Sequence, residues 1–195
     1  TVTTVADEQK MKRVLETVLG RPITEGNQVE ILRNGHEIFP SMLEAIGKAE
    51  RSIDFLTFIY WTGDIGRIFA EALSERARSG VRVRVLLDAL GAWRLDTEIP
   101  EIMSNAGCDV RWFRPVDKDD ALNANNRTHR KVMVVDELVG FSGGVGIADE
   151  WDGEARDETE WRDTHFRVVG PAVDGLRAAF LDNWAETGTD LIDYE

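Results

Sequence analysis

The stretch His129-Arg130-Lys131-Val132-Met133-Val134-Val135-Asp136 carries the most information about this chain. It has the form H-x-K-x-x-x-x-D and leads, within a few residues, to Gly143-Gly144. The apolar run inside it predicts a strand, and alternate residues of a strand project from the same face of a sheet. His129 and Lys131 therefore place an imidazole beside an ammonium group. A nucleophile next to a fixed positive charge is suited to attack on a phosphate ester.

The three spaced residues of this stretch are the first candidate catalytic residues. We expect His129 to be the nucleophile, and Lys131 to hold a phosphate oxygen and offset the negative charge of the transition state. Asp136 belongs to the same pattern, but it lies seven residues after His129. That odd offset puts it on the opposite face of a regular strand, so its position favours a carboxylate that fixes a turn.

Composition sets the class of protein. With 195 residues, 43% of them hydrophobic, the chain can bury one core and is most simply a single domain. The one cysteine, Cys108, excludes an internal disulfide and a cysteine-rich zinc site, and no cofactor or metal is expected. No apolar run approaches the ~20 residues that cross a bilayer, and no secretory signal is visible, so we expect a cytoplasmic or peripheral-membrane location. A net charge of -13 argues against a broad nucleic-acid-binding face.

Hydrophobic periodicity predicts alternating strands and helices. A first amphipathic helix at 7–19 is expected to pack on the domain, with membrane or partner contact as the alternative. The elements expected after it are strands at 29–32, 53–60, 81–87, 109–113, 131–135, 139–142 and 166–169, and helices at 39–46, 68–77, 97–104 and 173–184. The order of the central elements predicts an α/β fold with a mixed, mostly parallel sheet between helical layers. An acidic loop at 115–126 is expected at the rim of the site, and a second acidic loop is expected at 151–160.

Several segments together resemble a known family. They are the H-x-K-x-x-x-x-D stretch, the glycines between Phe141 and Trp151, and the run from Trp161-Arg162-Asp163-Thr164-His165 through Gly170-Pro171-Ala172-Val173. They resemble the phospholipase D superfamily, and within it the bacterial cardiolipin synthase and phospholipase branch. The resemblance covers nearly the whole chain. It implies a phospholipase D-like α/β/α sandwich and metal-independent chemistry through a phosphohistidine.

The resemblance also implies roles for further residues. Asp163 aligns with the acid that backs the histidine in the family, where a carboxylate would fix the imidazole tautomer; an ordinary surface aspartate is the alternative. Gly143 and Gly144 would let the backbone pass close to the substrate phosphate, with a β-bulge as the alternative. Gly146 stands where many members carry an Asn whose amide contacts the phosphate, so this third candidate substrate-binding position departs from the family.

Other polar and aromatic residues receive plainer expectations. His165 could share the face of Asp163, but a structural histidine is the expected role. Trp61, Trp93 and Trp151 lie at the ends of predicted elements, where aromatic rims contact apolar substrates, although core packing is the default.

Members of this family need two such motifs, with one histidine attacking phosphorus and the other protonating the leaving oxygen. This chain holds one motif. We expect residues 1–195 to form a single phospholipase D-like domain, with 1–25 as helix and linker, that is the N-terminal half of a two-motif lipid enzyme. A homodimeric single-motif phosphodiesterase or nuclease, and a non-catalytic half-domain, are the alternatives. The expected partners are a phospholipid or other phosphodiester at a membrane surface; the acidic charge disfavours nucleic acid.

Overall fold

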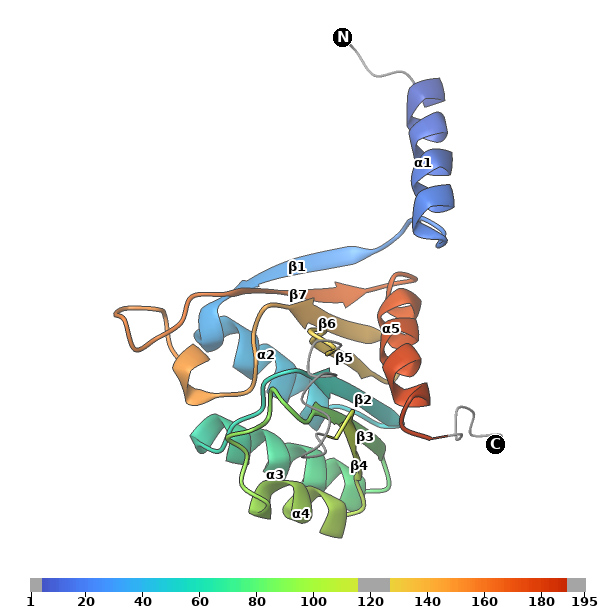
Figure 1. Ribbon diagram of the computed structural model, residues 1–195. Helices are drawn as coiled ribbons and strands as arrows, with labels where there is room; N and C mark the ends of the chain where they lie inside the picture. Colours follow the sequence, from blue (N-terminus) through green and yellow to red (C-terminus); the bar gives the residue numbers. More distant parts are fainter. Residues whose placement is uncertain (1–4, 116–126, 189–195) are drawn as a thin grey trace.

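The computed structural model describes residues 5–115 and 127–188, and one seven-stranded sheet runs through them. Figure 1 shows the sheet crossing the molecule with helices on both sides. In the order β1-β7-β6-β5-β2-β3-β4, the strands are Gln28–Arg33, Thr164–Val169, Val139–Gly143, Val132–Val135, Ser52–Thr57, Arg82–Asp88 and Asp109–Phe113. The predicted loop at 116–126 lies outside the described residues.

The strand pairing is mixed. β2 pairs in parallel with β3, and β3 with β4, while β1–β7, β7–β6, β6–β5 and β5–β2 are antiparallel. The predicted α/β fold with a mixed sheet is confirmed, but the expectation of mostly parallel pairs is wrong. Parallel neighbours require a crossover connection, and among neighbouring strands in the described residues helices join only β2 to β3 and β3 to β4.

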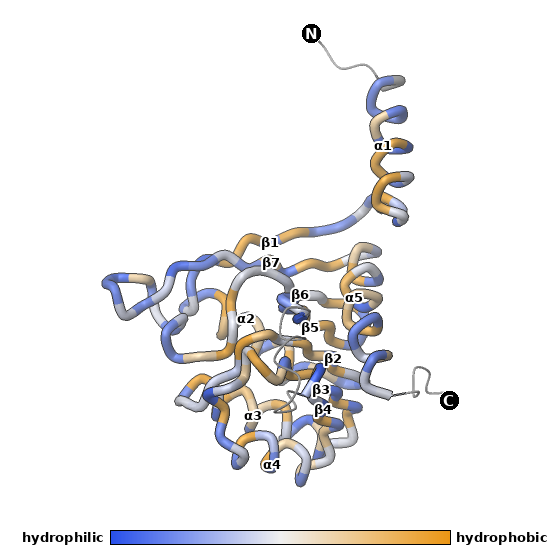
Figure 2. Tube along the Cα trace, viewed as in Figure 1, coloured by the Kyte–Doolittle hydropathy of each residue, from blue (hydrophilic) through white to orange (hydrophobic). Residues whose placement is uncertain are grey.

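Four helices cover the two faces of the sheet. α2 (Asn34–Gly47), α3 (Asp64–Arg78) and α4 (Glu98–Asn105) lie on one face, and α5 (Val173–Ala185) lies on the other (Figure 1). Strand alternation divides β5 between two cores: Met133 and Val135 join the larger core, and Val132 and Val134 join the core under α5. In Figure 2 the central strands of the sheet are largely hydrophobic and lie inside the fold.

The first helix, α1 (Val5–Leu19), projects away from the sheet (Figure 1). Its apolar stripe is exposed, so the prediction that this helix packs on the domain is wrong. The exposed residues of the stripe are Met11, Val14, Leu15, Val18 and Leu19. No helix in the described ranges has both the length and the apolar character needed to span a bilayer.

Candidate active site

His129 and Lys131 lie side by side immediately before β5. The ammonium nitrogen of Lys131 is 3.1 Å from Nδ1 of His129 and donates to the His129 carbonyl oxygen at 3.0 Å. Lys131 is buried, with 7% of its surface exposed, whereas His129 is exposed. The ring of Phe58 packs on the imidazole with centroids 4.6 Å apart. The structure therefore brings together the two side chains that the sequence pattern paired.

This contact defines the state of the imidazole. A protonated lysine has only donors, so Nδ1 must accept and the ring hydrogen of neutral His129 resides on Nε2. Desolvation lowers the pKa of His129 below its usual value, and the charge of Lys131 lowers it further, against an opposing effect of Asp88. His129 is thus held neutral, as a nucleophile requires.

An open cavity of about 510 Å³ adjoins the imidazole. It lies between the end of β4, the segment before β5 and the last turns of α5. Its lining combines arginines with acidic and amide side chains: Arg114, Arg127, Thr128, His129, Arg130, Asp182, Asn183 and Glu186, with Phe113 at its base. His129 therefore borders a polar space, whereas Lys131 and Asp163 are not among the residues that line it.

Asp136 lies at the opposite end of β5 from His129. Its carboxylate accepts hydrogen bonds from the backbone N–H groups of Glu50 (2.9 Å), Arg51 (2.7 Å) and Ser52 (2.8 Å). Burial alone would raise the pKa of Asp136, but the three donors outweigh it and hold the pKa below its usual value. With left-handed φ angles of 53° at Asp136 and 62° at Glu137, the residue fixes the β5–β6 turn. The geometry supports the turn-fixing interpretation of this motif residue.

Asp163 comes directly before β7 and does not bond to His129. Its Oδ2 accepts from Nε1 of Trp151 at 3.1 Å, and its Oδ1 accepts from the backbone N–H of Thr164 at 2.7 Å. The expected Asp163–His129 hydrogen bond is not made: Nδ1 of the imidazole contacts the Lys131 ammonium, and the Asp163 carboxylate accepts from Trp151 and Thr164. Asp163 acts on Lys131 instead: burial lowers the pKa of Lys131, and the carboxylate opposes that effect.

Asp163 is held in place by Asn34, which the sequence did not single out, and by Trp151, which was expected only as a core or rim aromatic. Asn34 accepts from the Asp163 backbone N–H through Oδ1 at 3.2 Å, and its own backbone N–H donates to the Asp163 carbonyl at 3.0 Å. It adopts a left-handed φ of 57°, and the Asn34-Gly35 dipeptide was the available signal, since Asn and Gly favour such turns. Trp151, the second residue, carried only a hydrophobic signal.

The predicted substrate-binding glycines allow close packing behind the site. A Cβ on Gly143 would lie 2.6 Å from Nδ1 of His165, and one on Gly144 would lie 2.2 Å from Oδ1 of Asp163. Gly146 is buried, and a Cβ there would lie 2.7 Å from Cβ of Ile59. These positions need glycine because neighbouring side chains fill the space, so their contact with a substrate phosphate stays a prediction.

His165 is buried, as expected of a structural histidine, but it lies close to the charged residues of the site. It pairs with Gly143 across β6 and β7, is 2% exposed, and its Nδ1 has no partner among the described residues. Burial lowers the pKa of His165 to about 4. The charge of Lys131 lowers this pKa further, and the charge of Asp163 raises it. His165 is therefore neutral at physiological pH.

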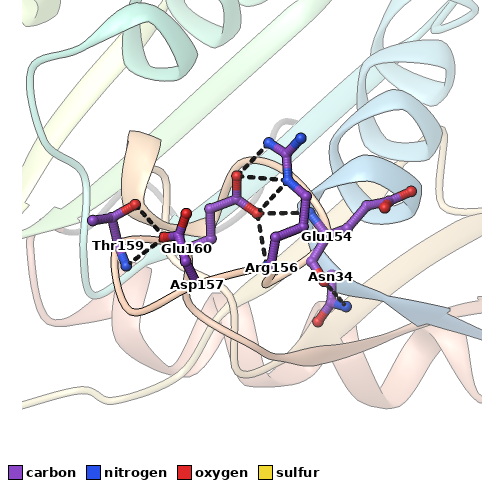
Figure 3. Close-up of polar contacts among 6 residues, drawn as sticks. All are labelled: Asn34, Glu154, Arg156, Asp157, Thr159 and Glu160. Atoms are coloured by element: carbon purple, nitrogen blue, oxygen red, sulfur yellow. Dashed lines mark hydrogen bonds and ion pairs between the residues drawn. The ribbon is translucent and has the colours of Figure 1, made fainter.

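The second acidic loop is ordered by its own side chains. It follows a short 3-10 helix, η2 (Asp149–Trp151). The Glu160 carboxylate accepts from the backbone N–H groups of Glu154 and Arg156 and pairs with the Arg156 guanidinium (Figure 3). Asn34 donates to the Glu154 carbonyl at 3.2 Å, which ties the loop to the start of α2 (Figure 3). Asn34 therefore contacts both this loop and Asp163. Trp161 directly follows the loop in the chain.

Solved structures share this architecture. Nuc from Salmonella typhimurium, described as a phospholipase D family member, superposes with a TM-score of 0.63 over 83% of this chain and 97% of that chain, at 16% identity. A phosphatidylserine synthase from Haemophilus influenzae Rd KW20 gives a TM-score of 0.62 over 80% of this chain and 36% of that chain, at 15% identity. The protein therefore has the fold of the phospholipase D class.

Sequence comparison narrows the class to one family. Residues 42–158 match the family model described as "Cardiolipin synthase, PLD-like domain". The chain is 37% identical over 178 residues to a cardiolipin synthase of Geobacillus kaustophilus, covering 91% of this chain and 36% of that protein. It is 34% identical over 185 residues to cardiolipin synthase 1 of Bacillus anthracis, covering 94% of this chain and 36% of that protein. The chain belongs to the cardiolipin synthase PLD-like domain family, and it spans about a third of the length of these relatives.

Proposed function

We propose that this chain carries one half-site of an enzyme that cleaves phosphodiesters or transfers phosphatidyl groups on phospholipids through a phosphohistidine. The observation that carries the proposal is the 3.1 Å contact between Nδ1 of His129 and the Lys131 ammonium. It places a neutral imidazole and a buried cation where a phosphate could meet both. The cardiolipin synthases among its relatives support phospholipid as the substrate class.

The reaction has two displacements at phosphorus. The lone pair of a His129 ring nitrogen forms an N–P bond while the bond from phosphorus to the first alcohol oxygen breaks. That oxygen leaves with a proton from a general acid. Water or a second alcohol then gives its proton to the deprotonated form of that general acid and attacks phosphorus, and the N–P bond breaks with its electron pair returning to the His129 nitrogen. Lys131 would offset the charge on the nonbridging oxygens in both steps.

Substrate binding would also free the nucleophile. The Nδ1 lone pair of His129 points at the Lys131 ammonium. A phosphate oxygen carries more negative charge than a neutral imidazole nitrogen, so it competes for the ammonium and leaves the imidazole available. If the His129 ring then turned toward Asp163, it could form the Asp163–His129 hydrogen bond that the sequence led us to expect.

The general acid has to come from outside the His129–Lys131 pair, because one imidazole cannot attack phosphorus and protonate the oxygen departing on the opposite side. His165 is a poor acid, since its pKa of about 4 leaves it unprotonated at neutral pH. A second motif would supply the acid, either in the same polypeptide or in a twofold-related copy.

A homodimeric phosphodiesterase is the second candidate, because a twofold-related copy could supply the second motif that one chain lacks. The net charge of -13 disfavours a nucleic-acid substrate for such a dimer.

The test is turnover of phosphatidylglycerol and of a chromogenic phosphodiester by the purified chain, with its mass in solution measured by light scattering. His129→Gln should abolish any turnover, and His36→Gln, which alters an exposed histidine of α2 outside the motif, should not. Turnover confined to a dimer would favour the homodimer. Robust His129-dependent turnover of phosphatidylglycerol by a strict monomer would contradict the need for a second motif, because its alkoxide leaving group needs a general acid.

A further inference from the structure

A row of indole rings and one arginine borders the candidate site. The Trp161 ring lies 6.1 Å from the Trp61 ring between centroids. The Arg94 guanidinium lies 4.4 Å from the Trp61 centroid and 4.8 Å from the Trp93 centroid. We call Trp61, Trp93, Arg94 and Trp161 the tryptophan rim.

The rim is continuous with the site. Trp161 packs against Trp151 with centroids 4.6 Å apart, and Trp151 donates to the Asp163 carboxylate. On its other side, Nε1 of Trp61 donates to the Gly91 carbonyl at 2.9 Å. Gly91 lies against the backbone of Phe58, whose ring covers the His129 imidazole. A surface that contacts the rim therefore lies beside the His129–Lys131 pair.

The outer members of the rim are exposed. Trp93 is 67% exposed and Trp161 is 41% exposed, and the neighbouring Leu90 is 41% exposed. The default expectation of core packing is correct for Trp61 and Trp151, which are buried, but wrong for Trp93. Exposed indoles on an ordered support are costly in water unless they meet a partner, because a large aromatic surface stays hydrated.

We propose that the tryptophan rim is the surface by which this protein docks on a phospholipid bilayer. Trp93, Trp161 and Leu90 enter the interfacial layer, where indole rings are favoured because one edge is polar and the body is apolar. Arg94 keeps its guanidinium among the lipid phosphates, exchanging its 3.6 Å pair with Glu150 for phosphate oxygens. This proposal deepens the proposed function and rests on it only for the identity of the substrate.

The aromatic composition of the rim predicts how docking depends on lipid charge. A protein of net charge -13 gains little from a negatively charged membrane, so burial of the indoles has to drive the association. Binding should therefore occur on neutral phosphatidylcholine vesicles and persist in high salt, where charge attraction is screened. A second copy of the chain is the competing occupant, and it would show as self-association.

The experiment measures binding of the whole chain to phosphatidylcholine vesicles by flotation. The Trp93→Ala/Trp161→Ala double variant should weaken binding about tenfold or more, since two exposed indoles are lost. Trp112→Ala removes a comparably exposed indole on β4 and is the matched control; it should bind within about twofold of the wild type. Val14→Asp/Val18→Asp breaks the exposed stripe of α1 and should also leave binding unchanged.

A second measurement covers the case of a misfolded variant. Vesicles with brominated acyl chains should quench the tryptophan fluorescence of the wild type, and Trp93→Phe/Trp161→Phe, which keeps the packing, should lose most of that quenching. His129→Gln should dock like the wild type, so failed docking and failed chemistry are distinguishable. The proposal is overturned if the double variant binds normally, if only the α1 variant loses binding, or if the rim variants change oligomeric mass instead.

Discussion

The Lys131 ammonium contacts His129 twice, at ring Nδ1 (3.1 Å) and at the backbone carbonyl (3.0 Å). One cation therefore fixes both the backbone before β5 and the tautomer of the imidazole. The same cation is the group that a phosphate would draw toward itself. The His129 imidazole is consequently neutral, and its Nδ1 lone pair is engaged by the ammonium.

Lys131→Met should raise the pKa of His129, because it removes a positive charge that disfavours imidazolium. NMR titration of the His129 ring measures this directly, with Lys48→Met, on an exposed residue following α2, as the control. In the wild type the acid limb of His129-dependent activity should lie below pH 6.5, since attack needs neutral imidazole and the pKa of His129 is lowered from that value. No change in the titration would contradict the assigned contact.

Asp136→Asn should reduce stability by about 1–3 kcal/mol, because an amide cannot serve all three backbone donors as a carboxylate does. The pKa of Asp136 is lowered in the folded state, so its contribution is present above pH 4 and is lost as pH falls through the folded pKa. Urea denaturation at pH 7 and pH 3 measures both effects. The folded variant should keep its reactivity at His129; loss of reactivity without loss of stability would favour a catalytic role.

Asp163→Ala should reduce stability by about 1–3 kcal/mol, because the Trp151 indole loses its acceptor. It should also lower the pKa of Lys131 further, since the neighbouring negative charge is removed. Chemical denaturation and a lysine-selective NMR titration give the two readouts, with the exposed Glu158→Ala as the control. Asp163 would be an ordinary surface aspartate, with no part in the site, if both quantities stayed at their wild-type values.

Gly146→Asn introduces the residue that the family resemblance implies at this position, yet it should destabilise this protein. The new Cβ would lie 2.7 Å from Cβ of Ile59 and 3.0 Å from the Trp151 ring, and such overpacking costs about 1–3 kcal/mol. Adding Ile59→Ala should recover part of the loss. Thermal unfolding of the single and double variants tests this. A more stable Gly146→Asn variant would show that the segment can move to admit the side chain.

Sequence reasoning succeeded where local periodicity controls the outcome. The β5 strand and the turn at Asp136 follow from the apolar run and its parity. His129 and Lys131 were expected to be neighbours and do contact each other, but both precede β5, so strand parity does not explain their contact. The partners of Asp163 could not be predicted in this way, because they depend on Asn34 and Trp151, which tertiary packing brings together from two distant segments. The prediction contained too many parallel strand pairs, because it extended the helix–strand alternation of β2 to β4 to the rest of the sheet. The strands β5, β6 and β7 follow one another without intervening α-helices and pair antiparallel.

The position of α1 relative to the sheet could not be predicted from its sequence pattern. An amphipathic period predicts a helix with one apolar side, but it does not say which surface covers that side. In the described structure Val18 is 76% exposed and Met11 is 59% exposed. The periodicity was therefore sufficient to predict the helix and insufficient to place it.

The most direct test of the account is to trap the covalent intermediate on His129. Bis(4-nitrophenyl) phosphate has a leaving group that departs without protonation, so the chain should react with it even without a second motif. We predict a burst of about one nitrophenolate per chain in the presence of EDTA, with an acid-labile phosphoryl adduct mapped to His129 by mass spectrometry. His129→Gln should show neither burst nor adduct. A burst that survives this substitution, or an adduct on another residue, would contradict the account.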